Sequence, residues 1–266
     1  MTGPVDDLDR VLGLVEARGS VLGRPLFRLA TVTSTNDEAH RAAKAGAPHG
    51  ATWVAERQTA GRGRRGRVWV SPPGEGLLFS TLMRLPCAPA QLPPLALIAG
   101  LAVRDAVARA APNVPISIKW PNDVVARDRK VAGVLVEASS LGSRVEAVIV
   151  GIGINVHTRS FPHDIADRAT SVALLGEGGP PADRAELLAD VLGTLDRDLH
   201  VFAARGLRLL RARLEAADAL RGRRVRCEGG TEGVAGGIDH DGRLVVRDDR
   251  GNIERWMAGE VNLVRG

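Results

Sequence analysis

Four arginines and three glycines are interleaved within residues 61–67, which read Gly-Arg-Gly-Arg-Arg-Gly-Arg. A guanidinium is a planar, charged group whose donors match the oxygens of a carboxylate or a phosphate. Glycines let backbone N–H groups approach the same ligand, because no Cβ stands in the way. The segment therefore predicts a loop that binds either a small anion or a polyanion.

The charge of this loop also predicts how it behaves. Like charges this close repel one another until an anion neutralises them. We therefore expect the loop to be mobile when empty and ordered when a ligand is bound. A flexible contact for nucleic acid is the competing interpretation, since basic runs often have that role.

Residues 119–123 form a second candidate segment, which reads Lys-Trp-Pro-Asn-Asp. The residue before a proline favours an extended backbone, so a strand should break where Asn122 and Asp123 lie. A plain turn would explain this pattern. The same two side chains could instead hold Mg²⁺ beside a phosphate chain. Lys130 offers an ammonium nearby in the sequence, and Gly133 a place where a ligand could approach the backbone.

Residues 151–155 read Gly-Ile-Gly-Ile-Asn and are the third candidate segment. They lack the third glycine of a dinucleotide fingerprint and do not open a convincing helix, so a Rossmann site is not supported. Glycines at alternate positions of a strand clear one face for a flat group or for another backbone. The chain also lacks a zinc-spaced His pair and a Gly-x-Ser-x-Gly elbow, which argues against zinc and serine hydrolases.

Composition limits the class of protein. Lys and Arg number 36 against 31 Asp and Glu, and no Tyr occurs, so a basic protein without a stacking platform is indicated. Cys87 and Cys227 have no paired spacing and are expected to be reduced structural thiols. Acidic residues near the N-terminus and the short longest apolar run, residues 95–103, predict a cytoplasmic protein without a membrane span.

The elements that must position the candidate residues follow from alternation and helical periodicity. A capping box at residues 35–38 predicts a helix that Gly46 can close. Other helices are expected over residues 6–18, after Pro93 and within 182–218. Strands are expected over residues 27–33, 51–56, 76–84, 116–119, 131–138 and 145–156, and shorter ones over 223–227, 234–238, 243–247 and 252–257.

These elements predict an α+β fold with a mixed, mainly antiparallel sheet and helices on one side of it. Near Ala219 the sequence pattern changes to short strands separated by Gly and Asp-Gly turns, which is typical of a small barrel. We therefore expect an N-terminal helix or leader over residues 1–26, a main domain over 27–218 and a barrel over 219–266.

Taken together, the three segments resemble the biotin protein ligase family, with Ser34-Thr35-Asn36, Gln58 and Lys130-Val131-Ala132-Gly133 in matching order and spacing. The resemblance spans roughly residues 27–266. It implies a class II aminoacyl-tRNA synthetase-like, or biotin–lipoate ligase, fold with an SH3-like C-terminal barrel. Some family members carry an N-terminal winged-helix domain that represses transcription. Only about 26 residues precede the match here, so specific DNA binding is not expected.

The resemblance implies a two-step reaction. Biotin and MgATP form biotinyl-5′-AMP, which then acylates one lysine of the biotin carboxyl carrier domain of an acyl-CoA carboxylase. Both small molecules are substrates, and no tightly bound prosthetic group is expected. Positioning and charge stabilisation must then supply the catalysis, which suits the residues present.

The resemblance also assigns roles to residues. Lys130 would bridge the biotin carboxylate and the α-phosphate, with Arg62 and Arg64 closing over both, and residues 157–170 would cover the adenine. The biotin contacts would be Ser34, Thr35, Asn36, Gln58, Arg62, Gly63, Arg64, Lys130 and Gly133. The ATP contacts would be Arg64, Arg67, Asn122, Asp123, Lys130 and Asn155, with Asn122 and Asp123 also next to Mg²⁺.

Two other functions stay open at this point. A lipoate-protein ligase has a similar fold and also activates a carboxylate with ATP, although the arginine-glycine loop favours biotin. A basic nucleic-acid-binding protein would use the same loop and would bind with a steep dependence on salt. The sequence carries no indication of the oligomeric state.

Overall fold

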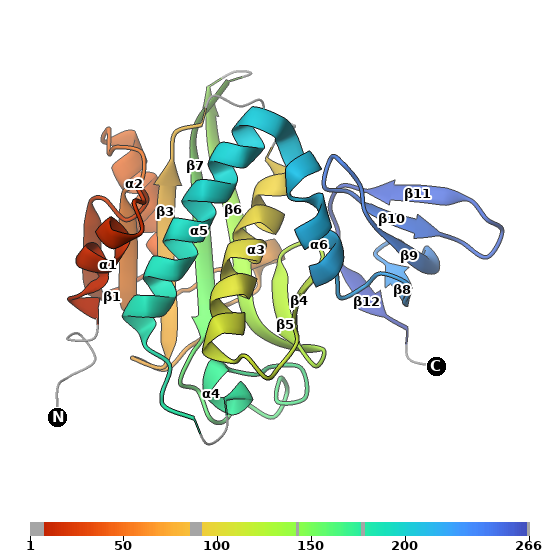
Figure 1. Cartoon of the computed structure of the whole chain (residues 1–266), viewed down its shortest axis with the longest axis horizontal. Helices are drawn as coiled ribbons and strands as arrows, with labels where there is room; N and C mark the ends of the chain where they lie inside the picture. The colour runs from red at the N-terminus through yellow and green to blue at the C-terminus, as the bar shows by residue number, and fades with distance from the viewer. Residues whose placement is uncertain (1–7, 86–91, 142–143, 177–178, 265–266) are drawn as a thin grey trace.

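A seven-stranded sheet forms the centre of the protein (Figure 1). The structure is a computed structural model that describes residues 8–85, 92–141, 144–176 and 179–264. The strand order is β1-β2-β3-β7-β6-β5-β4. Only β1 and β2 pair in parallel, so the expected mixed, mainly antiparallel sheet is confirmed. The strands are β1 (Leu26–Val32), β2 (Thr52–Gln58), β3 (Gly76–Met83), β4 (Ile116–Lys119), β5 (Asp123–Ala126), β6 (Arg129–Leu141) and β7 (Arg144–Asn155).

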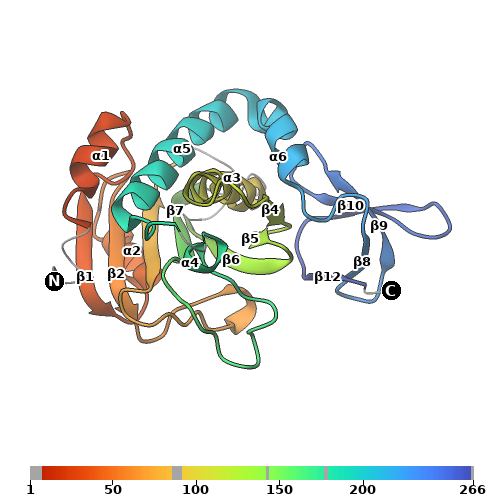
Figure 2. The ribbon, with the colours of Figure 1, turned by 60° about the horizontal axis from the view of Figure 1, so that its bottom comes forward.

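Two long helices, α3 (Pro93–Ala110) and α5 (Arg184–Arg205), cover one face of this sheet (Figure 2). Two prolines at the first positions of α3 start it without losing a hydrogen bond, as the sequence predicted. Asp183 caps α5 by accepting from the N–H groups of Ala185 and Glu186. The main hydrophobic core lies between these helices and the sheet.

Helix α2 (Thr35–Lys44) lies on the opposite face, so the expectation of helices on one side was wrong. Its Ala39 is fully buried in a second, smaller cluster with Trp53, Leu82 and Ile149. Adjacent residues of a strand point to opposite faces, so β2 serves both clusters: Trp53 belongs to the smaller one and Val54 to the main core.

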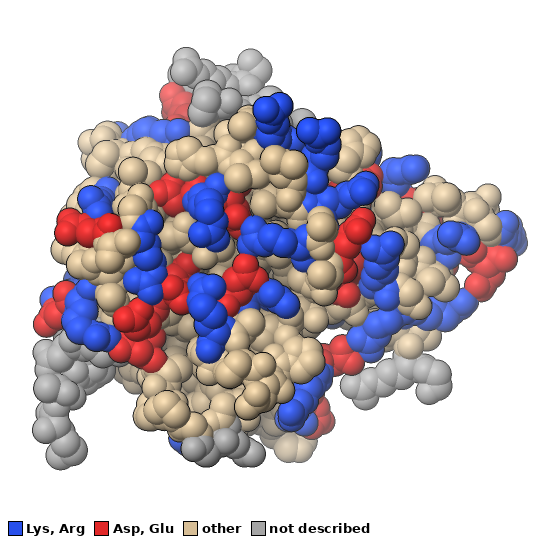
Figure 3. Space-filling model, viewed as in Figure 1, with Lys and Arg blue, Asp and Glu red and all other residues tan. Residues whose placement is uncertain are grey.

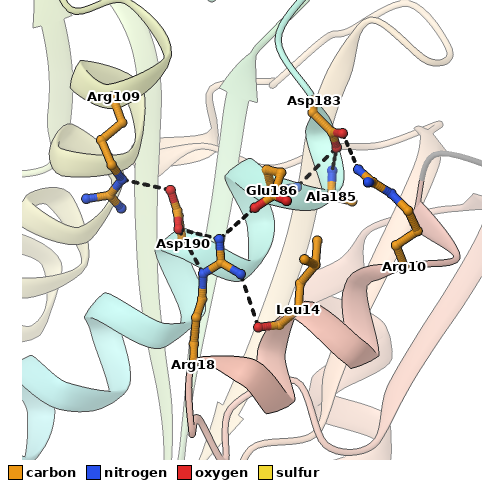
Figure 4. Close-up of polar contacts among 8 residues, drawn as sticks. All are labelled: Arg10, Leu14, Arg18, Arg109, Asp183, Ala185, Glu186 and Asp190. Carbon is orange, nitrogen blue, oxygen red and sulfur yellow. Dashed lines mark hydrogen bonds and ion pairs between the residues drawn. The ribbon is translucent and has the colours of Figure 1, made fainter.

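The N-terminal helix α1 (Val11–Ala17) packs against α5 in the same main core, with Val11 and Val15 fully buried. Charged side chains frame this contact (Figure 4). Arg18 lies 2.7 Å from both Glu186 and Asp190 of α5, and Arg109 of α3 lies 2.8 Å from Asp190. One aspartate of α5 therefore connects all three helices.

The long helical pattern after residue 182 does not form one helix. Gly206 has a φ of +61°, which ends α5, and two short helices follow, η4 (Gly206–Leu209) and α6 (Arg211–Ala217). A short helix α4 (Val172–Leu175) precedes α5. Among the described residues, no helix is both long and apolar enough to cross a membrane.

A five-stranded antiparallel sheet of order β11-β10-β9-β8-β12 forms the C-terminal unit. Cys227 is buried there, and burial raises the pKa of its thiol to about 11, as suits a structural residue. Cys87 lies outside the described residues. The strands are β8 (Arg224–Cys227), β9 (Glu232–Ile238), β10 (Leu244–Arg247), β11 (Ile253–Trp256) and β12 (Val261–Leu263).

Lys, Arg, Asp and Glu are intermixed on the face that carries α3 and α5 (Figure 3). The positive net charge is therefore not gathered into a basic stripe on this face.

Candidate functional site

A cleft lies on the face of the sheet that α3 and α5 leave uncovered, between α2 and residues 61–67, which we call the arginine loop. In Figure 2, the orange segment after β2 and the green segment after β7 extend from this side of the sheet. Every residue that the sequence assigned to the site lines the cleft, except Asp123 and Asn155. The cleft also contains Trp69, Leu135, Gly151 and Gly153.

The start of α2 supplies the neutral polar end of the cleft. Ser34 occupies the N-cap position, and the backbone N–H and hydroxyl of Thr35 donate to Gln58 Oε1 at 2.7 and 3.1 Å. No side chain caps the helix, so the expected capping box does not form, because the threonine binds Gln58 instead. Ser80 of β3 lies 2.7 Å from Thr35 Oγ1 and 2.5 Å from Asn36 Oδ1.

Glycines of β6 and β7 form the floor of the cleft. A Cβ on Gly151 would lie 2.1 Å from Asn36 Oδ1, and one on Gly153 would lie 2.5 Å from the Trp69 ring. The sequence predicted that these glycines admit a flat group or a backbone. The chain's own indole occupies the space at Gly153, and the Asn36 amide occupies the space at Gly151. Trp69 Nε1 is buried and has no hydrogen-bond partner among the described residues. Trp69 is not among the site residues predicted from the sequence.

Lys130 lies at the other end of this floor. Its ammonium is 2.6 Å from Asp123 Oδ1 and 5.4 Å from the centre of the Trp69 ring, a cation–π distance. A Cβ on Gly133 would lie only 2.9 Å from Lys130 Nζ, so the glycine makes room for the ammonium. The backbone of Lys130 is fixed by a bond from its N–H to Arg168 O at 2.8 Å.

Arg64 has contacts unlike those of the other loop arginines. Its guanidinium donates to neutral acceptors, Asn122 Oδ1 at 3.0 Å and Gly259 O at 3.4 Å. Burial, and then the charges of Arg65 and Arg67, lower the pKa of Arg64, although a guanidinium still carries its charge at neutral pH. A partly buried cation with neutral partners favours an anionic ligand.

The remaining arginines of the loop pair with carboxylates of the chain itself. Arg62 lies 2.8 Å from Asp37 and 2.9 Å from Glu137, Arg67 lies 2.9 Å from Glu260, and Arg65 pairs with Glu228. The expectation that only a ligand offsets the repulsion among these arginines was therefore wrong. The pairs of Arg65 and Arg67 are exposed on both sides and contribute little, so an incoming phosphate can replace them at small free-energy cost.

Two of the residues predicted to bind nucleotide have structural contacts. Asn122 Nδ2 donates to Val134 O at 2.8 Å, which holds the turn before β5 against β6. Asn155 is buried, and its Nδ2 donates to Thr170 O at 3.0 Å, which fixes the segment after β7. Asn155 therefore shapes the wall beside the cleft.

The chain is similar in sequence to known proteins. Residues 27–155 match the model of the biotin/lipoate A/B protein ligase family, and residues 222–264 match the biotin protein ligase C-terminal domain. The bifunctional ligase/repressor BirA of Bacillus spizizenii is 34% identical over 248 residues, covering 91% of this chain and 75% of that protein. The biotin--[acetyl-CoA-carboxylase] ligase of Mycobacterium tuberculosis is 37% identical over 246 residues, covering 90% of this chain and 88% of that protein.

A solved structure is also similar. The biotin protein ligase from Aquifex aeolicus in complex with biotin and ATP superposes with a TM-score of 0.77 at 34% sequence identity. The match covers 91% of this chain and 99% of that chain.

Proposed function

The chain belongs to the biotin protein ligases of the biotin/lipoate A/B protein ligase family, and from this premise we propose which residues of its cleft bind each substrate. The protein is a ligase whose substrates are biotin and ATP. In the first step a biotin carboxylate oxygen attacks the α-phosphorus of ATP, a new O–P bond forms, and pyrophosphate leaves. In the second step a lysine amine attacks the acyl carbon, and AMP leaves.

The observation that carries the proposal is the position of Lys130. Its ammonium lies beside Gly133, at the end of the glycine floor away from Asn36, in a cleft that Arg62, Arg64 and Arg67 also line. A carboxylate and a triphosphate repel each other, and a cation placed between them offsets that repulsion most in the transition state. Asp123 and Trp69 orient the ammonium, and the Lys130 side chain stays 36% exposed.

We assign the remaining contacts by end of the cleft. The polar end would bind biotin through Ser34, Thr35, Asn36, Gln58 and Gly133, and Arg62, Gly63 and Arg64 would close over it. Arg64, Arg67 and Asn122 would meet the phosphates, with Asp123 and Asn155 supporting them.

Magnesium enters as part of the substrate MgATP. The side-chain oxygens of Asn122 and Asp123 are of the kind that Mg²⁺ prefers. Asn122 Oδ1 accepts from Arg64 at 3.0 Å, and Asp123 Oδ1 lies 2.6 Å from the Lys130 ammonium. The contact of these two residues with the metal therefore stays a prediction.

The acceptor of biotin would be the biotin carboxyl carrier domain of an acyl-CoA carboxylase, which the name of the Mycobacterium relative supports. We propose a catalytic unit over residues 27–218 and a barrel over 219–266. A lipoate-protein ligase has less support, because residues 222–264 match the C-terminal domain of biotin protein ligases. The pairing of three loop arginines with carboxylates also weakens the nucleic-acid alternative.

The test is a single-turnover assay with α-labelled ATP and either biotin or lipoate, followed by addition of a carrier domain. Biotin should give labelled adenylate that disappears when the carrier is added and becomes biotinylated. If adenylate formed with lipoate but not with biotin, the proposal would be overturned in favour of a lipoate-protein ligase. Tight, salt-sensitive oligonucleotide binding without adenylate would favour a nucleic-acid-binding protein.

A further inference from the structure

Glu137 places a carboxylate beside a cleft that is otherwise rich in cations. Alternate residues of a strand share a face, so Glu137 points to the same side of β6 as Gly133 and Leu135, which line the cleft. A carboxylate there repels anionic substrates. The carboxylate of Glu137 is therefore better explained by the protein side chains that it contacts than by contact with a substrate.

One oxygen of this carboxylate gathers three side chains. Glu137 Oε2 accepts from Asn36 Nδ2 at 2.7 Å and from the Arg62 guanidinium at 2.9 Å, and it lies 3.5 Å from His40 Nε2. These partners come from α2 and from the arginine loop, so Glu137 connects both walls of the cleft to its floor.

The contact fixes the direction of the Asn36 amide. Asn36 is only 4% exposed, and its Oδ1 lies 2.5 Å from Ser80 Oγ. With Glu137 accepting from Nδ2, both ends of the amide have defined partners. Gly151 leaves the space in which this amide lies. The second N–H of the amide keeps a fixed direction as a result.

The two ends of the cleft differ in charge. Glu137 is four residues along β6 from Gly133, or roughly 13 Å at the usual rise of a strand. Lys130 Nζ lies next to Gly133. A ligand with one anionic end, such as biotin, is therefore favoured with its carboxylate at Lys130 and its neutral ring near Asn36.

We propose that Glu137 is a positioning residue that orients the Asn36 amide and holds Arg62 over the polar end of the cleft. This inference rests on the proposed function where it concerns biotin. Glu137 acts through its two partners and lies away from the reacting atoms. It should therefore govern the affinity for biotin and leave the chemical step nearly unchanged.

The first test compares Glu137→Ala and Glu137→Gln with Glu146→Ala, a matched control at an exposed position of β7. The alanine variant should raise the biotin KM roughly tenfold or more, as loss of hydrogen bonds to a charged group does. Its kcat at saturating biotin should fall less than about threefold, by the same argument. The glutamine variant retains an acceptor for Asn36, so it should recover most of the affinity.

The second test needs no ligand. The side-chain amide protons of Asn36 should exchange slowly in the wild type, and faster in Glu137→Ala, when followed by NMR. Glu137→Gln, which is nearly isosteric and should fold, should shift the resonance while exchange stays slow. An unchanged Asn36 signal in both variants, together with an unchanged biotin KM, overturns the inference. If the wild type made no adenylate, the proposed function would fail while the Asn36 signal still decided the role of Glu137.

Discussion

Lys130 shows how one side chain can be positioned by groups that the reaction does not consume. Asp123 attracts the ammonium from one side, and the face of Trp69 attracts it from another. A long, flexible side chain loses conformational freedom when it is fixed. Because these neighbours hold it before substrates bind, that loss does not reduce its effect on the transition state.

Replacing Lys130 by alanine should lower the rate of adenylate formation roughly 10²-fold or more, because an oriented electrostatic donor is lost. Single-turnover kinetics with biotin and α-labelled ATP measure this rate. Lys44→Ala, at an exposed position of α2, is a suitable control and should leave the rate unchanged. A wild-type rate in the Lys130 variant would refute the assignment.

Arg64→Gly should give a different defect. The variant should still make some adenylate, but it should release it faster, because the loop no longer closes the cleft against water. The off-rate of labelled biotinyl-5′-AMP measures this effect in a filter or gel-filtration assay. Retention of the intermediate as long as in the wild type would show that Arg64 does not close the site.

The sequence predicted the motif residues of the cleft well and missed the residues that hold them. Arg64 and Lys130 stand in patterns with chemical meaning, so their types alone attract attention. Glu137 and Ser80 lie in ordinary strands, 101 and 44 positions from Asn36. Only the register of the sheet brings them to that amide, and register is not visible in one strand's sequence.

At the scale of elements, the sequence predicted the long strands and most of the short ones, and it missed β5 and β12. Strands β6 and β7 pair Gly133 with Gly153 and Leu135 with Gly151, which places the glycines on one face. Strand β5 begins at Asp123, inside the segment predicted as a turn, and β12 has only three residues, too few to show a periodic pattern. The position of α2 was missed because its short apolar face fits either side of the sheet.

The arginine loop should become harder to cleave when its ligands bind. Its pairs with Glu228 and Glu260 are exposed and therefore weak, whereas bound biotin and ATP would engage it through buried contacts. Thermolysin should attack near Val68, which is 69% exposed, and biotin with MgATP should slow that cleavage severalfold. ATP alone and biotin alone serve as controls. Equal cleavage with and without both ligands would exclude ordering of the loop.

At the scale of the whole molecule, the barrel is joined to the main sheet at several points. The buried indole N–H of Trp120 donates to Gly242 O at 3.0 Å, and the N–H of Ala219 donates to Ile118 O at 2.9 Å. The arginine loop adds its contacts with Glu228, Gly259 and Glu260. The barrel therefore forms part of the support for the arginine loop.

The pair of Arg65 and Glu228 tests this support without altering a residue assigned to substrate. Glu228→Arg should place a second cation beside Arg65, which would raise the ATP KM about twofold to fivefold and speed cleavage by thermolysin. The effect should be modest because the pair is exposed. The Arg65→Glu, Glu228→Arg double variant restores opposite charges and should return both quantities toward wild type. Asp249→Arg, which alters a barrel carboxylate paired with Arg224, is the control for added charge alone. If the double variant behaved as the sum of the two single variants, the barrel would not hold the loop through this pair.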